Sequence, residues 1–153
     1  MNLITPLLKP GNVVAGLQVA SKKRLFEQAA MAFKTNDGCN PTEVSDSLLE
    51  REKLGSTALG YGIAIPHGRI KGLREARGAF VRLRQPVAFD APDGKPVSQV
   101  FVLLVPEQAT DLHLQLLSEL AQMFSEKAFR EKLSAAASPA DLALLFRAWE
   151  PMS

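Results

Sequence analysis

One histidine of this chain follows a short apolar run directly, a position that suits chemistry. His67 lies in the run 62–68, GIAIPHG, and is one of two histidines in the sequence. We expect residues 63–65 to form a strand that ends at Pro66, so a rigid element would hold the imidazole while it still faces solvent. Near neutral pH an imidazole can act as a nucleophile or carry a proton. The alternative is a loop histidine that merely follows a proline, but the flanking glycines and Pro66 favour a positioned side chain.

The second histidine, His113, lies in the first turn of a helix that we expect over residues 111–124. Leu117, Leu120 and Phe124 continue its line at helical spacing, so His113 heads an apolar stripe. Alone, this pattern is typical of a histidine at the edge of a core. The amides and dipole of a helix N-terminus also disfavour an imidazolium and favour a bound anion. If the preceding turn brings this helix over the strand ends, His113 approaches His67.

Arg51 is a cation on the apolar line of a helix that we expect over residues 41–54. Val44 and Leu48 precede it on this face, and Leu54 follows. Two interpretations stay open. The guanidinium can complete the negative C-terminal end of the helix and extend outward to solvent. It can equally be held at a cleft, where its planar fork would bind a phosphoryl group.

The loop after this helix carries two hydroxyls among several glycines, a composition that suits phosphate only loosely. Ser56 and Thr57 follow Gly55, but the Gly-Lys-Ser/Thr sequence of a P-loop is absent. Thr57 could donate a hydrogen bond to a histidine or a phosphate. The more ordinary role of such a residue is to cap a turn.

Two other kinds of site have little support. A metal centre needs three or more ligands at suitable spacing, and two histidines, one cysteine and scattered carboxylates form no such motif. A serine hydrolase of the nucleophile-elbow type needs Gly-x-Ser-x-Gly, which the sequence lacks. We therefore expect no metal and no cofactor.

The composition is that of an ordinary globular chain, 46% hydrophobic and 22% charged. Its 153 residues are typical of one domain, expected to span 1–153. A formal net charge of +2 gives no long-range attraction to nucleic acid or membrane, and no apolar stretch is long enough to cross a bilayer. The start lacks the pattern of a signal peptide. A single cysteine, Cys39, excludes an intrachain disulfide and fits a reducing compartment, so we expect a cytoplasmic protein.

Capping residues and breakers divide the chain into helices and strands. Ser21, Asn40 and Ser138 are each expected to cap a helix, the last two with proline at the first helical position. The helices are expected over 22–34, 41–54, 111–124, 129–133 and from 139 onward, and strands over 13–19, 63–65, 79–83, 87–89 and 100–105. The last run is continuously apolar, which is typical of a strand buried on both faces.

This order predicts an α/β fold, a single domain whose mixed, mostly parallel β-sheet is flanked by helices on both faces. In such folds binding sites cluster at the carboxyl ends of strands. His67 is expected at one such end.

Three segments together resemble a known family. They are residues 49–57 (LEREKLGST), residues 62–68 (GIAIPHG) and the strand 102–106 (VLLVP) with His113 beyond it. The chain resembles, over nearly its whole length, the enzyme IIA domains of the fructose–mannitol class of the bacterial phosphoenolpyruvate-dependent phosphotransferase system. Within that class it looks most like the nitrogen-regulatory branch.

The resemblance implies a role for each matching residue. His67 falls on the phosphoacceptor, His113 on the second active-site histidine that supports the phosphohistidine, and Arg51 on the arginine that neutralises phosphoryl charge. Thr57 lies in the segment that packs against the site, and with Ser56 and Gly68 it is expected to support the phosphoryl group.

The resemblance also implies partners. The phosphoryl donor would be an HPr-like phosphocarrier protein, and the phosphorylated chain would act mainly as a regulator of nitrogen, potassium or carbon metabolism through target proteins. One alternative is a detached IIA subunit that passes the phosphoryl group to a IIB domain of a fructose- or mannitol-type permease. Another is a purely binding regulatory module. No nucleic acid partner and no membrane insertion are expected.

Overall fold

A computed structural model describes residues 2–108 and 111–151 of the chain. The expected domain 1–153 extends in part beyond these residues. The described elements are the 3-10 turn η1 (Thr5–Leu7), the strands β1 (Leu8–Leu17), β2 (Ala58–Gly60), β3 (Ile63–Ala64), β4 (His67–Ile70), β5 (Arg77–Val87) and β6 (Val97–Pro106), and the helices α1 (Lys22–Asp37), α2 (Pro41–Lys53), α3 (Asp111–Ser125), α4 (Lys127–Ala135) and α5 (Pro139–Ala148).

The strands form one mixed sheet in the order β1-β5-β6-β3-β2, and β4 also pairs with β6. The β1–β5, β3–β6 and β4–β6 pairings are parallel, whereas β5–β6 and β2–β3 are antiparallel. The central strand β6 is buried on both faces, as its apolar sequence predicts. The expected α/β fold with a mixed sheet is confirmed.

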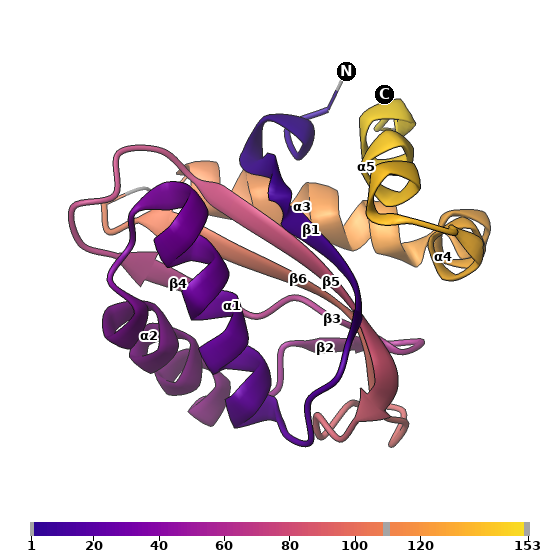
Figure 1. The fold of residues 1–153 in the computed structure, drawn as a ribbon, viewed down its shortest axis with the longest axis horizontal. Helices are drawn as coiled ribbons and strands as arrows, with labels where there is room; N and C mark the ends of the chain where they lie inside the picture. Colours follow the sequence, from indigo (N-terminus) through magenta and orange to yellow (C-terminus); the bar gives the residue numbers. More distant parts are fainter. Residues whose placement is uncertain (1, 109–110, 152–153) are drawn as a thin grey trace.

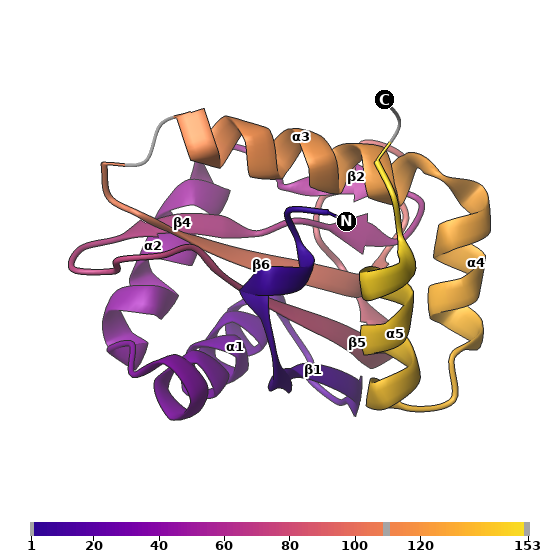
Figure 2. The same ribbon diagram turned by 90° about the horizontal axis from the view of Figure 1, so that it is seen from above.

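Helices cover both faces of this sheet, and side chains of β6 alternate between two cores. Val100, Val102 and Leu104 pack into the core under α1 and α2. Phe101, Leu103 and Val105 pack into the core under α3, α4 and α5. Figures 1 and 2 show α1 and α2 on one side of the sheet and the other three helices on the opposite side.

The predicted helix starts are confirmed by their capping hydrogen bonds. The side chains of Ser21, Asn40 and Ser138 each accept from the backbone N–H three residues later. The helix 111–124 is one residue longer, whereas α4 extends two residues beyond the predicted 129–133 at each end. The first helix runs on to Asp37, where Gly38 takes a left-handed conformation and ends it.

Several predicted strand boundaries are wrong. The two strands expected at 79–83 and 87–89 form one strand, β5, with a register shift between Arg82 and Val87. Strand β1 is Leu8–Leu17 instead of 13–19. Residues 58–60, expected as loop, form β2 because they pair with β3. The β2–β3 pairing is local, with Ala58 opposite Ala64, but strands of three and two residues are too short to show a strand pattern. The extents of β1 and β5 depend on partners distant in sequence, which local patterning does not reveal.

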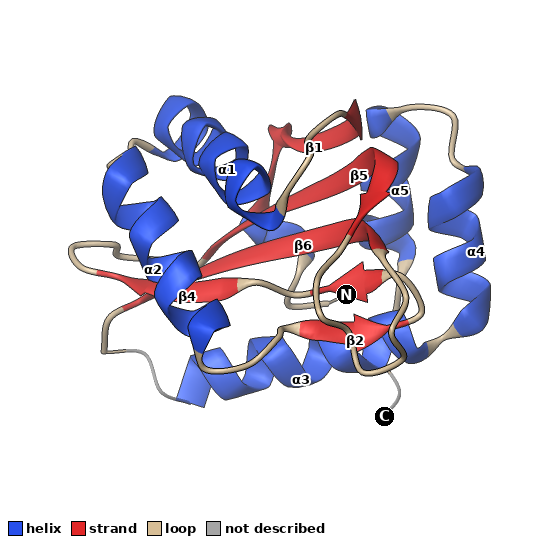
Figure 3. Ribbon diagram, turned by 90° about the horizontal axis from the view of Figure 1, so that it is seen from below, coloured by secondary structure: helices blue, strands red, loops and turns tan. Residues whose placement is uncertain are grey.

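The strand before His67 is interrupted at Pro66 and then continues. Both β3 and β4 lie parallel to β6, and His67 stands opposite Leu103. The carbonyl of Pro66 accepts from the Leu103 N–H at 2.9 Å, so the chain stays attached to β6 across the break. His67 is therefore the first residue of β4, the strand labelled in Figure 3. The expectation that Pro66 ends the strand and leaves His67 beyond it is wrong, because the chain stays paired with β6 after the proline.

Candidate functional site

The His67 imidazole is oriented by a backbone carbonyl. Its Nδ1 lies 2.8 Å from the carbonyl oxygen of Ile65, two residues earlier. A carbonyl oxygen only accepts hydrogen bonds, so Nδ1 carries the hydrogen and Nε2 keeps its lone pair. The fixed backbone of β4 and the Pro66 junction therefore present Nε2 of His67 as the free nucleophilic atom.

His113 lies beside His67, as the sequence predicts if the β6–α3 turn folds back over the strands. The ring centroids are 5.2 Å apart and the ring planes meet at 72°. Both side chains are half-buried. Nε2 of His113 is buried without a hydrogen-bond partner among the described residues. An unpartnered buried nitrogen is costly, so this atom is ready to interact with a group brought to the site.

The surroundings of both imidazoles favour the neutral form. Burial is the main cause that lowers the pKa of His67, and the charge of Arg51 lowers it further, against opposing effects of the Ile65 carbonyl and Glu52. Burial also lowers the pKa of His113, with further lowering by His67, Arg69 and Arg51. A neutral imidazole is the form that can attack an electrophile.

The structure places the Arg51 guanidinium at the end of α2, and its binding of a phosphoryl group stays a prediction. Its Nη1 donates to the carbonyl of Gly55, just beyond the helix, at 2.9 Å. Its charge acts on both histidines, so it also belongs to the electrostatic environment of the site. The apolar face of α2 does not continue to Leu54 as expected. Leu54 is 86% exposed, whereas Glu52 is buried.

The side-chain hydroxyls of Ser56 and Thr57 both donate hydrogen bonds to other groups of the protein. The Thr57 hydroxyl donates to Glu52 Oε1 at 2.6 Å, and the Ser56 hydroxyl donates to the carbonyl of Phe89 at 2.5 Å. Thr57 thus bonds to a side chain of α2 and does not cap a turn, whereas the Ser56 hydroxyl oxygen accepts from the Ala58 N–H at 3.1 Å. A part for either residue in supporting a phosphoryl group stays a prediction.

Gly68 brings α2 close to β4. A Cβ at this position would overlap the side chain of Ser47 on α2. Ser47 in turn donates to the carbonyl of Arg69 at 3.1 Å. Gly68 therefore sets the distance between the strand that carries His67 and the helix that carries Arg51, and any contact with a phosphoryl group stays a prediction.

Two charged residues near the site were missed by sequence reasoning. Glu52 is buried and accepts from Lys22 Nζ at 2.9 Å and from Thr57, and its charge raises the pKa of His67. The sequence did contain one signal for its burial: Glu52 follows the apolar Leu48 by four residues, on the same face of the helix. Arg69 donates to the carbonyl of Glu107 at 2.9 Å. This bond links β4 to the turn that leads to His113, and no local pattern predicts it.

The arrangement offers one nucleophilic nitrogen, a second neutral imidazole and a nearby guanidinium. This set suits attack on an anionic electrophile such as a phosphoryl group, because fixed positive and hydrogen-bonding groups surround the nucleophile. Among the described residues, no cluster of three histidine, cysteine or carboxylate side chains could hold a metal ion. No helix in the described part of the chain is long and apolar enough to cross a membrane.

Comparison with known proteins defines the class. A sequence profile of the family "Phosphoenolpyruvate-dependent sugar phosphotransferase system, EIIA 2" matches residues 6–148. The chain belongs to this family of phosphotransferase-system IIA components.

Within the family, several of the similar proteins are nitrogen-regulatory ones. A nitrogen regulatory protein of Bradyrhizobium diazoefficiens is 42% identical over 132 residues, 86% of each chain. One from Pseudomonas aeruginosa is 43% identical over 131 residues, 85% of each chain. The crystal structure of the nitrogen regulatory protein IIA-Ntr from Neisseria meningitidis superposes with a TM-score of 0.89 at 49% identity, covering 94% of this chain and 99% of that one.

Proposed function

We propose that this chain is a phosphohistidine phosphocarrier that accepts a phosphoryl group on Nε2 of His67 from an HPr-like protein. The observation that carries the proposal is the orientation of His67, whose Nδ1 is bonded to the Ile65 carbonyl while a second imidazole lies 5.2 Å away. Membership of a phosphotransferase-system family supports the reaction class.

The proposed step exchanges one N–P bond for another. The lone pair of His67 Nε2 attacks phosphorus in line with the N–P bond of the donor phosphohistidine. That bond breaks, and its electron pair returns to the donor imidazole. Positive charge that develops on the His67 ring is carried by Nδ1–H, which donates to the Ile65 carbonyl. No oxidant, reductant or water is consumed.

The neighbouring groups would stabilise the charge on the phosphoryl oxygens. Nε2 of His113 has no partner among the described residues, so it can interact with a phosphoryl oxygen. The Arg51 guanidinium, held at the end of α2, supplies positive charge. A fixed cation and a polarisable imidazole together suffice for the transfer, and no metal or cofactor enters the proposed step.

The test is reconstitution of the transfer. Purified protein is incubated with phosphoenolpyruvate, enzyme I and an HPr-type carrier, and its intact mass is measured beside that of His67→Ala. We expect one added phosphoryl group that is labile in acid and absent from the variant. A wild-type protein that stays unmodified with carriers of its own organism would rule out the transfer mechanism.

The proposed regulatory role follows the nitrogen-regulatory relatives, whose names describe regulation. We propose that phosphorylation of His67 controls binding to target proteins in nitrogen, potassium or carbon metabolism. Target control that survives unchanged in His67→Ala would favour a purely binding module instead. Onward transfer from the phosphorylated chain to an added IIB domain would favour a detached subunit of a sugar permease, an alternative that the word "sugar" in the family description keeps open.

A further inference from the structure

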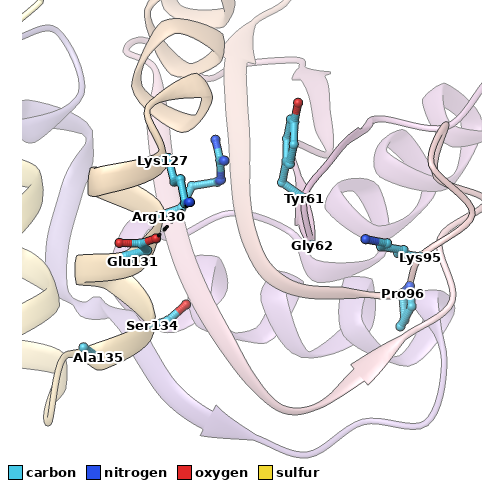
Figure 4. Close-up of a pocket in the computed structure, with 9 residues that line it drawn as sticks. All are labelled: Tyr61, Gly62, Lys95, Pro96, Lys127, Arg130, Glu131, Ser134 and Ala135. Atoms are coloured by element: carbon cyan, nitrogen blue, oxygen red, sulfur yellow. Dashed lines mark ion pairs between the residues drawn. The ribbon is translucent and has the colours of Figure 1, made fainter.

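A second hollow of the surface lies apart from the two histidines, at the other end of β6. It has a volume of about 750 Å³ and lies between α4 and the loop before β3 (Figure 4). Volumes of this order are typical of small-molecule sites. Gln99, near this end of β6, stands four residues before Leu103, the register partner of His67. Four residues of strand span about 13 Å, so the hollow is separate from the histidine pair.

Basic side chains gather at this hollow. Lys127 and Arg130 reach into it from α4, and Lys95 lines it from the loop before β6, as Figure 4 shows. Glu131 is the acidic residue of the lining, and it pairs with Lys127 at 3.9 Å. Among the described residues, Lys95 and Arg130 have no ion pair with a carboxylate. The lining thus holds an excess of positive charge that favours an anion.

A serine adds a hydrogen-bond donor to this set. The Ser134 hydroxyl oxygen lines the hollow and accepts from Gln99 Nε2 at 2.7 Å. Gln99 is only 4% exposed, and its Oε1 has no partner in the described part of the chain. Because the Ser134 oxygen accepts a hydrogen bond from Gln99, the hydrogen of the Ser134 hydroxyl points away from Gln99. The hydroxyl donates no hydrogen bond to another described residue, so its hydrogen is available to an anion in the hollow.

An aromatic wall stands beside these donors. The ring of Tyr61 is 71% exposed, and the Arg130 guanidinium lies 4.2 Å from its centroid. Tyr61 has a φ of 58°, a conformation that non-glycine residues rarely adopt. Its N–H donates to Asp93 Oδ2 at 3.0 Å, which holds the strained backbone in place. Arg130 is further fixed by donating to the carbonyl of Phe124. The guanidinium and the ring are therefore preorganised.

We propose that this hollow is a binding site for a small organic phosphate. The phosphate group would bind Lys127, Arg130 and the Ser134 hydroxyl, since a guanidinium fork and an ammonium match phosphate oxygens. The carbon body of the ligand would lie against Tyr61 and Pro96, which form the less polar part of the lining. This site is independent of phosphoryl transfer at His67.

The test is titration of ¹⁵N-labelled protein with AMP, adenosine and inorganic phosphate, followed by NMR. We expect AMP to shift the amides of Tyr61, Gly62 and Ser134 with a Kd of about 1 mM or tighter, several-fold tighter than inorganic phosphate, whereas adenosine does not bind. Because His67→Ala leaves this hollow intact, the variant should bind AMP as wild type does. Shifts confined to the His67 region, or AMP binding no tighter than adenosine or inorganic phosphate, would overturn the proposal.

Variants on α4 supply the matched control. Arg130→Ala and Lys127→Ala should each weaken AMP binding about ten-fold, while Lys132→Ala should leave it unchanged. Lys132 is exposed on the same helix but does not line the hollow. Lys127 is exposed, so its replacement leaves folding intact even if Arg130→Ala disturbs the Phe124 contact. Equal weakening by Lys132→Ala would indicate general charge attraction and would contradict a built site.

Discussion

At the scale of single residues, the reactivity of His67 depends on the neutrality of its ring. Burial and Arg51 lower the pKa of His67 below its ordinary value of 6.5. We expect the rate of phosphoryl acceptance to be constant above pH 6.5 and to fall as the pH drops through the lowered pKa, because the protonated ring has no lone pair on Nε2. The pH titration of the His67 ring by NMR, with His67→Ala to assign the resonance, measures this pKa.

The same titration has a control in α2. Arg51→Ala should raise the pKa of His67 toward 6.5, whereas Lys53→Ala, an exposed cation two residues on, should leave it unchanged. The lowered pKa also makes stability depend on pH. As the pH falls below 6.5, His67 is protonated in the unfolded chain before it is protonated in the folded chain. The contribution of this residue to stability is therefore complete above pH 6.5 and declines below it. A midpoint at or above 6.5 in the wild type would contradict the proposed electrostatic environment.

His113 provides the second prediction at this scale. If its unpartnered Nε2 stabilises charge in the transition state, His113→Ala should slow phosphoryl acceptance by about 100-fold. Stability should change little, since the side chain is half-buried and makes no hydrogen bond through Nε2 to the described residues. The rate is measured with an HPr-type donor by intact mass over time. Gln115→Ala, an exposed change on the same helix, is the control, and equal rates in both variants would deny His113 this role.

At the scale of secondary-structure elements, the contact between β4 and α2 decides where Arg51 lies relative to His67. Gly68→Ala would place a methyl group against Ser47. We expect a loss of about 1–3 kcal/mol in the free energy of unfolding, because overpacking at a rigid contact forces the elements apart. Urea denaturation measures the loss. Phosphoryl acceptance should also slow, since α2 carries Arg51.

A double-variant cycle isolates this contact. Ser47→Ala removes the Oγ atom that the new methyl group would meet. Gly68→Ala should therefore cost less stability in the Ser47→Ala background than in the wild type, by about 1 kcal/mol. Additive losses would mean that the strain arises elsewhere and that Gly68 does not set the spacing of β4 and α2.

The elements also show how far the sequence could be read. The starts of α1, α2 and α5 were predictable because Ser21, Asn40 and Ser138 cap them through local hydrogen bonds. The strands were less predictable. Strand β4 is defined by β6, which is distant in sequence, whereas β2 pairs with the nearby β3 but is only three residues long. The same division holds at the site. His67 and Arg51 carry local signals, whereas the nearness of His113 depends on how the β6–α3 turn folds.

Glu52 and Arg69 illustrate what local patterns omit. The carboxylate of Glu52 is buried on an apolar helix face. Its burial is explained by the ion pair with Lys22, which lies on another helix. From the sequence alone, Arg69 would be interpreted as an exposed strand residue. Only the folded structure shows that its guanidinium donates to the Glu107 carbonyl. The resemblance to IIA domains adds an expected role for each candidate residue, because it carries three-dimensional information that spacing alone lacks.

At the scale of the whole molecule, β6 joins two hydrophobic cores into one cooperative unit. Its alternate side chains belong to the core under α1 and α2 and to the core under α3, α4 and α5. If β6 detached from one core, its side chains would also leave the other core, and that core would be exposed to water. We therefore expect unfolding to be a single transition, although the two clusters have no buried side chain in common among the described residues.

The sole tryptophan makes this testable. Trp149 is 6% exposed and lies in the core under α3–α5, so its fluorescence reports on that side of the sheet, while circular dichroism reports on the whole chain. Leu48→Ala creates a cavity in the opposite core, where Leu48 is 1% exposed, and should cost about 2–5 kcal/mol. If β6 couples the cores, the urea midpoint seen by Trp149 must fall as far as the midpoint seen by circular dichroism. Leu54→Ala, at an 86% exposed position at the end of the same helix, should move neither. The prediction fails if the Trp149 midpoint stays in place while the circular dichroism midpoint falls, because the two faces would then unfold separately. In that case the contact between α2 and β4 could open without loss of the core beneath His113.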